Sequence, residues 1–242
     1  MVFSIFSIIF LFINCDSEDI DDFSISPQFG KKIALFGGSF ACYEDSNYAI
    51  DYWCEKLNLK MANYSSGGAG FSNLTKSPTL QEQVDSACRK TAPVYDIYLF
   101  WASTNDFYLA NPFVGNVDDY TNDDGYDDNK LNTQCGGINY CFKKIKEKNP
   151  RALILFMTSI GYYRELGKGT SPTYEGEDGM NVFVNLQKAV CTKWNVPCLD
   201  QFNVIINESN WTMFLREDKL HLNKKGYIAI REAQMKFIAN PI

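Results

Sequence analysis

The chain has 242 residues, of which 45% are hydrophobic and 21% are charged, and its formal net charge is −6. This composition suits one globular domain with a sizeable core and argues against a disordered chain. No long cluster of Lys and Arg is present, which argues against a nucleic-acid-binding surface because phosphate contacts require concentrated cations.

The N-terminus carries an apolar run over residues 2–13, followed by Asn14 and Cys15. The run is shorter than the ~20 residues that a membrane-spanning helix needs, so we expect a signal segment over 1–15. Its end resembles a bacterial lipoprotein signal, with Cys15 as the lipidated residue and membrane tether. We therefore expect export as a periplasmic or outer-membrane, cell-surface lipoprotein, and otherwise as a secreted protein.

After this signal, residues 16–30 are expected to form an acidic, solvated tether, and residues 31–242 one folded domain. Seven further cysteines follow Cys15. Export would allow disulfides among them, for example within the close pairs Cys135/Cys141 and Cys191/Cys198, while a reduced, buried set is equally consistent. Without a CxxC pair and with a single histidine, the chain predicts no metal site.

Hydrophobic periodicity predicts strands that alternate with helices along this domain. Strands are expected at 32–36, 59–64, 95–101, 152–158 and 196–199, and helices at 46–57, 80–89, 131–148, 180–194 and 223–238. This alternation favours an α/β fold, a three-layer α/β/α sandwich around a mostly parallel five-stranded sheet. Residues 111–128 are predicted to be a long surface loop, and they lack the spacing of a calcium-binding EF-hand.

Three polar turns follow the expected strands: Ser39 after Gly37 and Gly38, the segment 65–70, and the segment 103–106. In parallel sheets ligands bind where the carboxyl ends of the strands open into loops, so these turns should gather at one edge. A serine after two glycines is by itself more often an ordinary turn or helix cap.

The only histidine of the chain, His221, lies three residues after Asp218. An imidazole is the usual base near neutral pH, and a carboxylate at this distance can fix its tautomer if the segment turns. The alternative is a surface histidine beside a helix cap. Together with Ser39, these residues predict the nucleophile, base and orienting acid of a serine hydrolase.

Four segments, in order, resemble the four blocks of the SGNH (GDSL-like) hydrolase superfamily. Residues 37–40 are similar to Gly-Asp-Ser-Leu, with Gly38 in place of Asp and Phe40 in place of Leu. Residues 63–68 resemble the second block, residues 103–106 resemble Gly-x-Asn-Asp with Ser103 in place of Gly, and residues 218–221 match Asp-x-x-His.

The resemblance implies the SGNH hydrolase fold, which is flavodoxin-like, and a role for each residue that matches. Ser39 is implied as the nucleophile, and His221, oriented by Asp218, as its base. The backbone N–H groups of Ser39 and Gly68, with Gly67 as the alternative to Gly68, and the side-chain amide of Asn105 are implied as donors to the oxyanion. The chemistry implied needs no cofactor and no metal.

The predicted activity is that of a serine esterase, which hydrolyses a carboxylic ester through an acyl-enzyme. By analogy with exported relatives we expect a small acyl ester or acylated glycan as substrate, with acetyl or other short acyl groups removed from carbohydrate. The same triad could serve a lipase, a thioesterase or an O-acyltransferase. A non-catalytic glycan-binding surface lipoprotein is the remaining alternative, and Ser103 is its chief support.

Aromatic residues after the third expected strand have two interpretations. They could stack on sugars or pack onto their own domain, and the sequence does not separate the two. These residues are Phe107, Tyr108, Phe113 and Tyr120.

Overall fold

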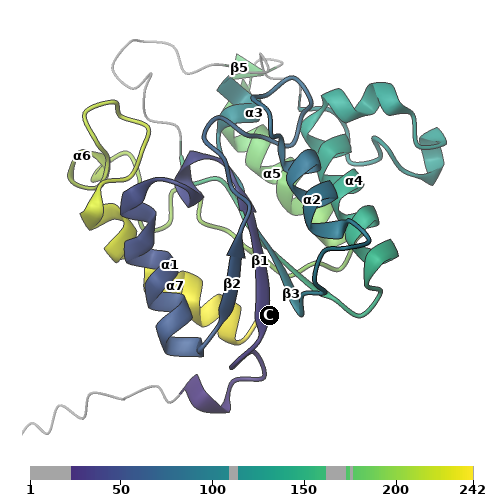
Figure 1. Ribbon diagram of the computed structural model, residues 1–242. Coiled ribbons are helices and arrows are strands. Elements are labelled where there is room, and N and C mark those ends of the chain that lie inside the picture. Colours follow the sequence, from purple (N-terminus) through teal and green to yellow (C-terminus); the bar gives the residue numbers. More distant parts are fainter. Residues whose placement is uncertain (1–22, 109–113, 162–172, 175–176, 242) are drawn as a thin grey trace, which may run out of the picture.

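A computed structural model describes residues 23–108, 114–161, 173–174 and 177–241. Its centre is a parallel five-stranded sheet in the order β2-β1-β3-β4-β7 (Figure 1). The strands are β1 (Lys32–Gly37), β2 (Lys60–Asn63), β3 (Ile97–Trp101), β4 (Leu153–Met157) and β7 (Cys198–Leu199). The predicted mostly parallel five-stranded sheet is confirmed.

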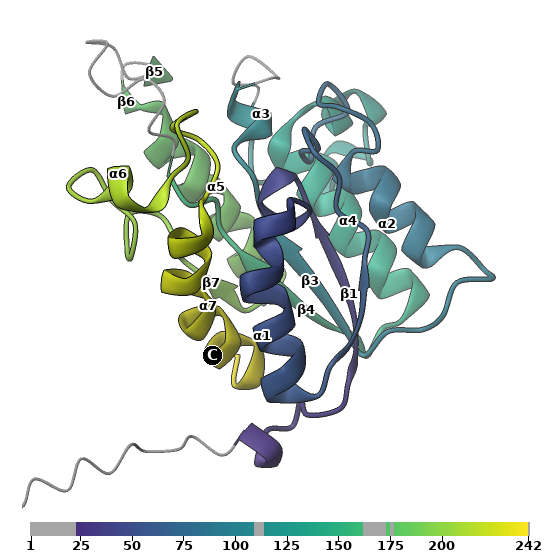
Figure 2. The ribbon, with the colours of Figure 1, turned by 60° about the vertical axis from the view of Figure 1, so that its left-hand side comes forward.

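In the described part of the chain, five long helices cover the two faces of the sheet (Figures 1 and 2). They are α1 (Asn47–Leu57), α2 (Leu80–Cys88), α4 (Gln134–Lys148), α5 (Gly179–Lys193) and α7 (Lys224–Ala239). Alternate residues of β1 divide the core: Ile33 and Leu35 pack with α1 and α7, whereas Ala34 and Phe36 pack with α2, α4 and α5. The three-layer α/β/α prediction is therefore confirmed.

The apolar run of β3 explains its central place. All five of its residues are buried, and it pairs with β1 on one side and β4 on the other. A strand that is covered on both faces has no solvent side, which is why its sequence is continuously apolar rather than alternating. The carboxyl ends of β1 and β3 therefore lie side by side, at Gly37 and Trp101.

Some elements differ from the sequence expectation. Helix α4 begins at Gln134 because the Thr133 side chain accepts a hydrogen bond from the Gly136 N–H and caps the helix. The preceding residues form a separate 3₁₀ segment, η5 (Asp128–Asn132). The antiparallel strands β5 (Thr173–Tyr174) and β6 (Glu177–Asp178) were not predicted, since two-residue strands carry no periodicity.

Other short elements lie in the connections between the strands and the long helices. These are α3 (Asn105–Tyr108), α6 (Trp211–Phe214) and the 3₁₀ segments η1 (Phe23–Ile25), η2 (Ser39–Ala41), η3 (Glu44–Ser46) and η4 (Asn122–Asp124). Both η4 and η5 fall within or beside the predicted surface loop, which is therefore partly structured.

The signal segment and Cys15 lie outside the described residues. The end of the expected tether packs on the domain: Phe23 contacts the core, and the Ser26 hydroxyl donates to the Ala239 carbonyl at 2.7 Å. The Gly30 N–H also donates to the Leu57 carbonyl. The part of the tether from residue 23 onward thus belongs to the folded unit.

The seven cysteines that the structure describes carry free thiols. Burial raises the pKa of the Cys54 and Cys88 thiols to about 11 in both cases, which disfavours the reactive thiolate. Within the described residues no group of three or more His, Cys, Asp and Glu side chains is placed to hold a metal ion. None of the helices in the described part of the chain is long and apolar enough to cross a membrane.

Candidate active site

Ser39 lies two residues after the end of β1 and begins the 3₁₀ segment η2. Gly37 must lack a side chain here, since a Cβ would approach the Trp101 carbonyl oxygen of β3 to 2.8 Å. The buried Gln83 side chain of α2 holds the same glycine, accepting from its N–H and donating to its carbonyl, both at 3.1 Å. Packing against the neighbouring strand and helix therefore fixes the turn that presents Ser39.

His221 completes a hydrogen-bonded chain from Ser39 to Asp218. The His221 Nε2 atom lies 2.9 Å from Ser39 Oγ, and Nδ1 lies 2.6 Å from Asp218 Oδ2. Residues 182 positions apart in the sequence are thus in direct contact, because the loop before α7 ends beside the turn after β1. The structure places the three predicted residues together in the geometry of a catalytic triad.

The loop that carries Asp218 and His221 is held locally. The Asp218 Oδ1 atom accepts hydrogen bonds from the Leu220 and His221 N–H groups, both at 2.9 Å. Partial burial raises the pKa of Asp218, but hydrogen bonds from the His221 ring and from these two N–H groups outweigh it and lower the pKa below its ordinary value. Asp218 is therefore a carboxylate at neutral pH.

Two further side chains lie beside the imidazole. The Tyr43 ring packs against the His221 ring with a centroid distance of 4.4 Å, and the Arg216 guanidinium lies over the Tyr43 ring at 5.2 Å. Arg216 also forms an ion pair with Asp45 at 2.6 Å. Tyr43 is a residue that sequence reasoning missed, and its position three residues before the α1 cap gave no signal for this contact.

The second polar turn lies against the first. The Asn63 amide donates to the Ala41 carbonyl at 2.8 Å, and the Ser66 N–H donates to the Gly37 carbonyl at 3.1 Å. Gly68 has a positive φ of 87°, a conformation that favours glycine, and a Cβ placed on it would lie 2.9 Å from the Lys76 side chain. The segment with Gly68 is thus tied to the turn that carries the serine.

Asn105 reaches the same place from the third turn. Its side-chain Nδ2 donates to the Ala69 carbonyl at 2.7 Å, and an amide has a second N–H for another acceptor. A Cβ placed on Gly38 would lie 2.8 Å from this Nδ2 atom, so the amide sits directly beside the residue that precedes Ser39. The structure therefore brings the predicted triad and the three turns with the predicted oxyanion donors together, whereas Cys15 lies outside the described residues.

Asp106 is a further residue of this turn whose function sequence reasoning did not recognise. Its carboxylate is buried and accepts from the Phe71 and Ser72 N–H groups at 2.9 and 2.6 Å. Burial raises its pKa to about 6, although these hydrogen bonds act in the opposite direction. Its place beside Asn105 in the block 103–106 was the available signal.

Two of the four aromatic residues considered for sugar stacking pack within the domain. Phe107 is buried, with its ring centroid 5.7 Å from that of Phe183. Tyr120 packs against Tyr126 and Tyr140 at 5.5 and 5.6 Å. Phe113 and the Tyr108 side chain lie outside the described residues. For Phe107 and Tyr120 the packing interpretation holds.

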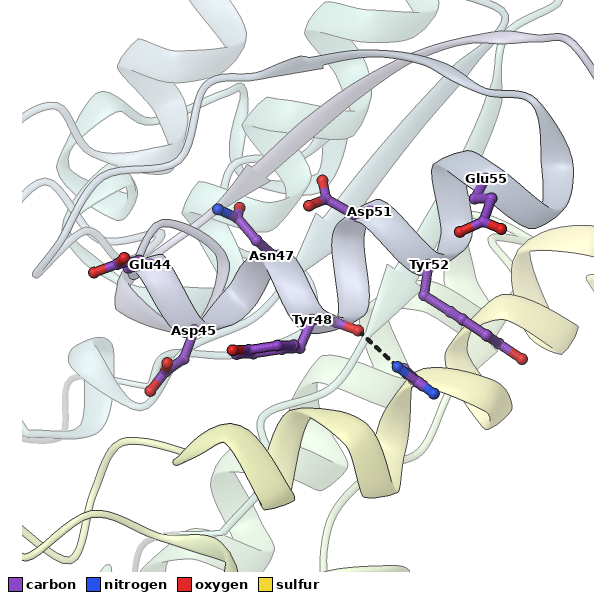
Figure 3. Close-up of a pocket in the computed structure, with 8 residues that line it drawn as sticks. Glu44, Asp45, Asn47, Tyr48, Asp51, Tyr52 and Glu55 are labelled. Atoms are coloured by element: carbon purple, nitrogen blue, oxygen red, sulfur yellow. Dashed lines mark hydrogen bonds between the residues drawn. The ribbon is translucent and has the colours of Figure 1, made fainter.

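A separate acidic depression of about 370 Å³ lies along α1 (Figure 3). It is lined by the carboxylates of Glu44, Asp45, Asp51 and Glu55, by Asn47, Tyr48 and Tyr52, and by Arg231. The Arg231 guanidinium donates to the Tyr48 carbonyl at 3.5 Å and stacks on the Tyr52 ring at 4.3 Å. The Arg231 guanidinium of the depression thus already contacts the Tyr52 ring and the Tyr48 backbone, and none of the predicted site residues lines the depression.

A parallel α/β sandwich with a Ser-His-Asp chain at the carboxyl edge of its sheet has the architecture of a serine hydrolase. Residues 35–229 match the GDSL-like lipase/acylhydrolase family. This match covers most of the sequence, and the chain belongs to that family, whose members hydrolyse ester bonds. No curated protein sequence matches the chain.

Solved structures support the same fold. The chain is similar to a possible lipase from Chitinophaga pinensis, with 19% identity, coverage of 85% of this chain and 96% of the other, and a TM-score of 0.57. A lipase/acylhydrolase from Enterococcus faecalis has 16% identity, with coverage of 88% of this chain and 98% of the other, and a TM-score of 0.58. A lipolytic G-D-S-L family protein from Veillonella parvula has 12% identity, with coverage of 85% of this chain and 96% of the other, and a TM-score of 0.55.

Proposed function

We propose that this esterase uses Ser39 as a nucleophile and removes acetyl or other short acyl groups from carbohydrate through an acyl-enzyme. The observation that carries the proposal is the continuous contact from Ser39 Oγ through the His221 ring to Asp218, at 2.9 and 2.6 Å. A serine hydroxyl is a weak nucleophile unless an adjacent base takes its proton, and this geometry supplies that base.

The reaction begins when Ser39 Oγ attacks the ester carbonyl carbon while His221 Nε2 takes the hydroxyl proton. Asp218, whose lowered pKa keeps it ionised well below neutral pH, stabilises the imidazolium that forms. The bond between the carbonyl carbon and the sugar oxygen then breaks, and His221 gives its proton to that oxygen. Water repeats the sequence on the acyl-enzyme, which releases the carboxylic acid and restores Ser39.

The negative charge on the carbonyl oxygen requires donors that are in place before the reaction. The Ser39 and Gly68 N–H groups and the second N–H of the Asn105 amide are the proposed donors. Hydrogen bonds from Asn63, Ser66 and Asn105 hold the three turns against one another, which supports this assignment. Preorganised donors of this kind avoid the cost of reorienting solvent.

The side of the site beside His221 receives the leaving alcohol, because the imidazolium must deliver its proton there. Tyr43 borders that side and offers an aromatic ring with a polar tip, a surface suited to a sugar. The class of acyl group rests on resemblance to exported family members.

A substrate panel tests the proposal. p-Nitrophenyl esters from acetate to palmitate and an acetylated oligosaccharide would be compared with the wild-type domain and Ser39→Ala. We expect the highest kcat/KM on acetyl esters, release of acetate from the oligosaccharide, and intact-mass detection of one acetyl group on the wild type alone. Preference for long chains would replace the deacetylase assignment with a lipase, and transfer to an added alcohol in place of hydrolysis would indicate an acyltransferase.

We also propose that the protein is exported and tethered through a lipidated Cys15. The apolar run over residues 2–13 and the cysteine that follows it support this. Mass spectrometry of the N-terminal peptide from the membrane fraction should show a diacylated cysteine, and Cys15→Ser should move the protein to the soluble fraction. An unmodified N-terminus in a protein that remains inside the cell would contradict export.

A further inference from the structure

Ser103 and Gly38 share one small space beside the nucleophile. A Cβ built on Gly38 would lie 2.8 Å from Ser103 Cβ, 2.8 Å from the Ala69 carbonyl oxygen and 2.8 Å from Asn105 Nδ2. Real Cβ atoms do not approach other heavy atoms this closely. Position 38 must therefore be glycine as long as Ser103, Ala69 and Asn105 keep their present places.

The requirement for glycine at position 38 comes from space and not from a left-handed backbone. Gly38 has φ −92° and ψ −149°, which lies outside the left-handed region that favours glycine. A substitution to alanine would therefore test contact with the neighbouring side chains and carbonyl.

The Ser103 side chain borders this space, and its hydroxyl makes two hydrogen bonds. The hydroxyl donates to the Ala69 carbonyl at 2.9 Å and accepts a hydrogen bond from the Asn105 N–H, with 3.3 Å between oxygen and nitrogen. The Asn105 side chain donates to the same carbonyl at 2.7 Å. One carbonyl oxygen therefore joins two residues of the third turn to the segment that carries Gly68, and Ser103 is only 2% exposed.

We propose that Ser103 is a positioning residue of the oxyanion side, whose hydroxyl and the Asn105 amide together hold the Ala69 carbonyl, with Gly38 leaving the space that this arrangement needs. The inference rests on the proposed function, because it holds that Ser103 keeps the two proposed oxyanion donors, the Asn105 amide and the Gly68 N–H, in position. It also explains why the sequence departs from the family blocks at both positions: the two departures, Gly38 and Ser103, are in contact.

The proposal requires that substitutions at the two positions are coupled. In wild type, Gly38→Ala pushes on Ser103, Ala69 and Asn105, and we expect kcat to fall roughly 100-fold. In the Ser103→Gly background the Cβ and the hydroxyl that anchors Ala69 are both gone, so the carbonyl can move away. In that background we expect Gly38→Ala to lower kcat roughly tenfold or less, since substitutions of residues in contact have non-additive effects.

Ser103→Ala tests the hydroxyl itself and is the variant that is expected to fold in every case, because it keeps the Cβ. We expect a roughly tenfold lower kcat with little change in KM, since a displaced oxyanion donor acts in the transition state more than in substrate binding. Ser26→Ala is the matched control: its buried hydroxyl also donates to a backbone carbonyl, that of Ala239, at 2.7 Å. Ser26→Ala should lower the thermal unfolding midpoint and leave kcat unchanged.

The experiment measures kcat and KM on p-nitrophenyl acetate and the thermal unfolding midpoint for wild type, Gly38→Ala, Ser103→Gly, the double variant, Ser103→Ala and Ser26→Ala. Coupling in kcat together with the kcat effect of Ser103→Ala supports the proposal. Additive kcat effects, coupling in the midpoint alone, or a Ser103→Ala enzyme with wild-type kcat would overturn it. An inactive but folded wild type would instead refute the proposed function.

Discussion

The two halves of the candidate site are built in different ways. On the nucleophile and oxyanion side, Ser39, Ser103 and Asn105 are buried, and their hydrogen bonds join turns that lie more than 30 residues apart in the sequence. On the acid–base side, the His221 and Asp218 side chains are 14% and 38% exposed and are hydrogen-bonded to each other within a four-residue turn. One half depends on the packed core, whereas the other depends on a surface loop.

This difference predicts how each half responds to change. Substitutions in the loop should remove activity and leave the fold intact, because few buried contacts depend on them. Substitutions on the oxyanion side should reduce activity and stability together, because they also leave buried polar groups without partners. Three predictions test the comparison, in order of expected effect.

Asp218→Asn should have the largest effect of the three. An amide at this position no longer stabilises the imidazolium or the required tautomer of His221, so we expect kcat to fall ~10³ to 10⁴-fold. The thermal midpoint should stay close to that of wild type because Asp218 lies in the exposed loop. Glu217→Gln removes a neighbouring charge as a matched control, and a similar loss of activity in this control would refute the assigned role.

Asn105→Ala should lower kcat by ~10² to 10³-fold with a smaller change in KM, since one oxyanion donor is lost. It should also reduce stability, because the Ala69 carbonyl loses a buried donor. Asn139 is a matched control, since its buried amide donates to the Val117 and Asp119 carbonyls away from the site. Asn139→Ala should destabilise the protein without lowering kcat, and equal kcat losses in the two variants would contradict the prediction.

Asp106 should make stability depend on pH. Its pKa is raised from 3.8 to about 6 in the folded protein, so the folded state holds this proton more tightly than the unfolded chain does. The resulting stabilisation is complete below pH 3.8 and is lost as the pH rises through about 6, by up to about 3 kcal/mol.

Urea unfolding of wild type and Asp106→Asn between pH 4 and pH 8 would measure this contribution. The free energy of unfolding of wild type minus that of the variant should decrease as the pH rises across this interval. A difference that stays constant, or that grows with pH, would show that the folded-state pKa of Asp106 is not raised.

Local patterns were enough to predict the main elements and the residues of the site. The apolar runs at β1, β3 and β4 and the single histidine three residues after an aspartate are strong signals within short segments. The carboxyl-edge rule for parallel sheets then placed Ser39 and the other turns together. The structure agrees because each of these signals is independent of distant packing.

What the sequence could not show depends on contacts between distant segments. Gln83 holds Gly37 from 46 residues away, and Asp106 holds the Phe71 and Ser72 N–H groups from the adjacent turn. The substitution Ser103, which sequence reasoning treated as support for a non-catalytic protein, is hydrogen-bonded in the space beside Gly38. That Gly38 and Ser103 fit beside each other is visible only when a Cβ placed on Gly38 is compared with the Cβ of Ser103.

The central claim is that Ser39 is an activated nucleophile. The most direct test is labelling by a fluorophosphonate probe, which reacts with a positioned, activated serine, followed by mass spectrometry of the modified peptide. We expect the wild type to carry one adduct on Ser39, His221→Ala to label far more slowly and Ser39→Ala not at all. A folded wild type that stays unlabelled, or an adduct on a serine other than Ser39, would contradict the account.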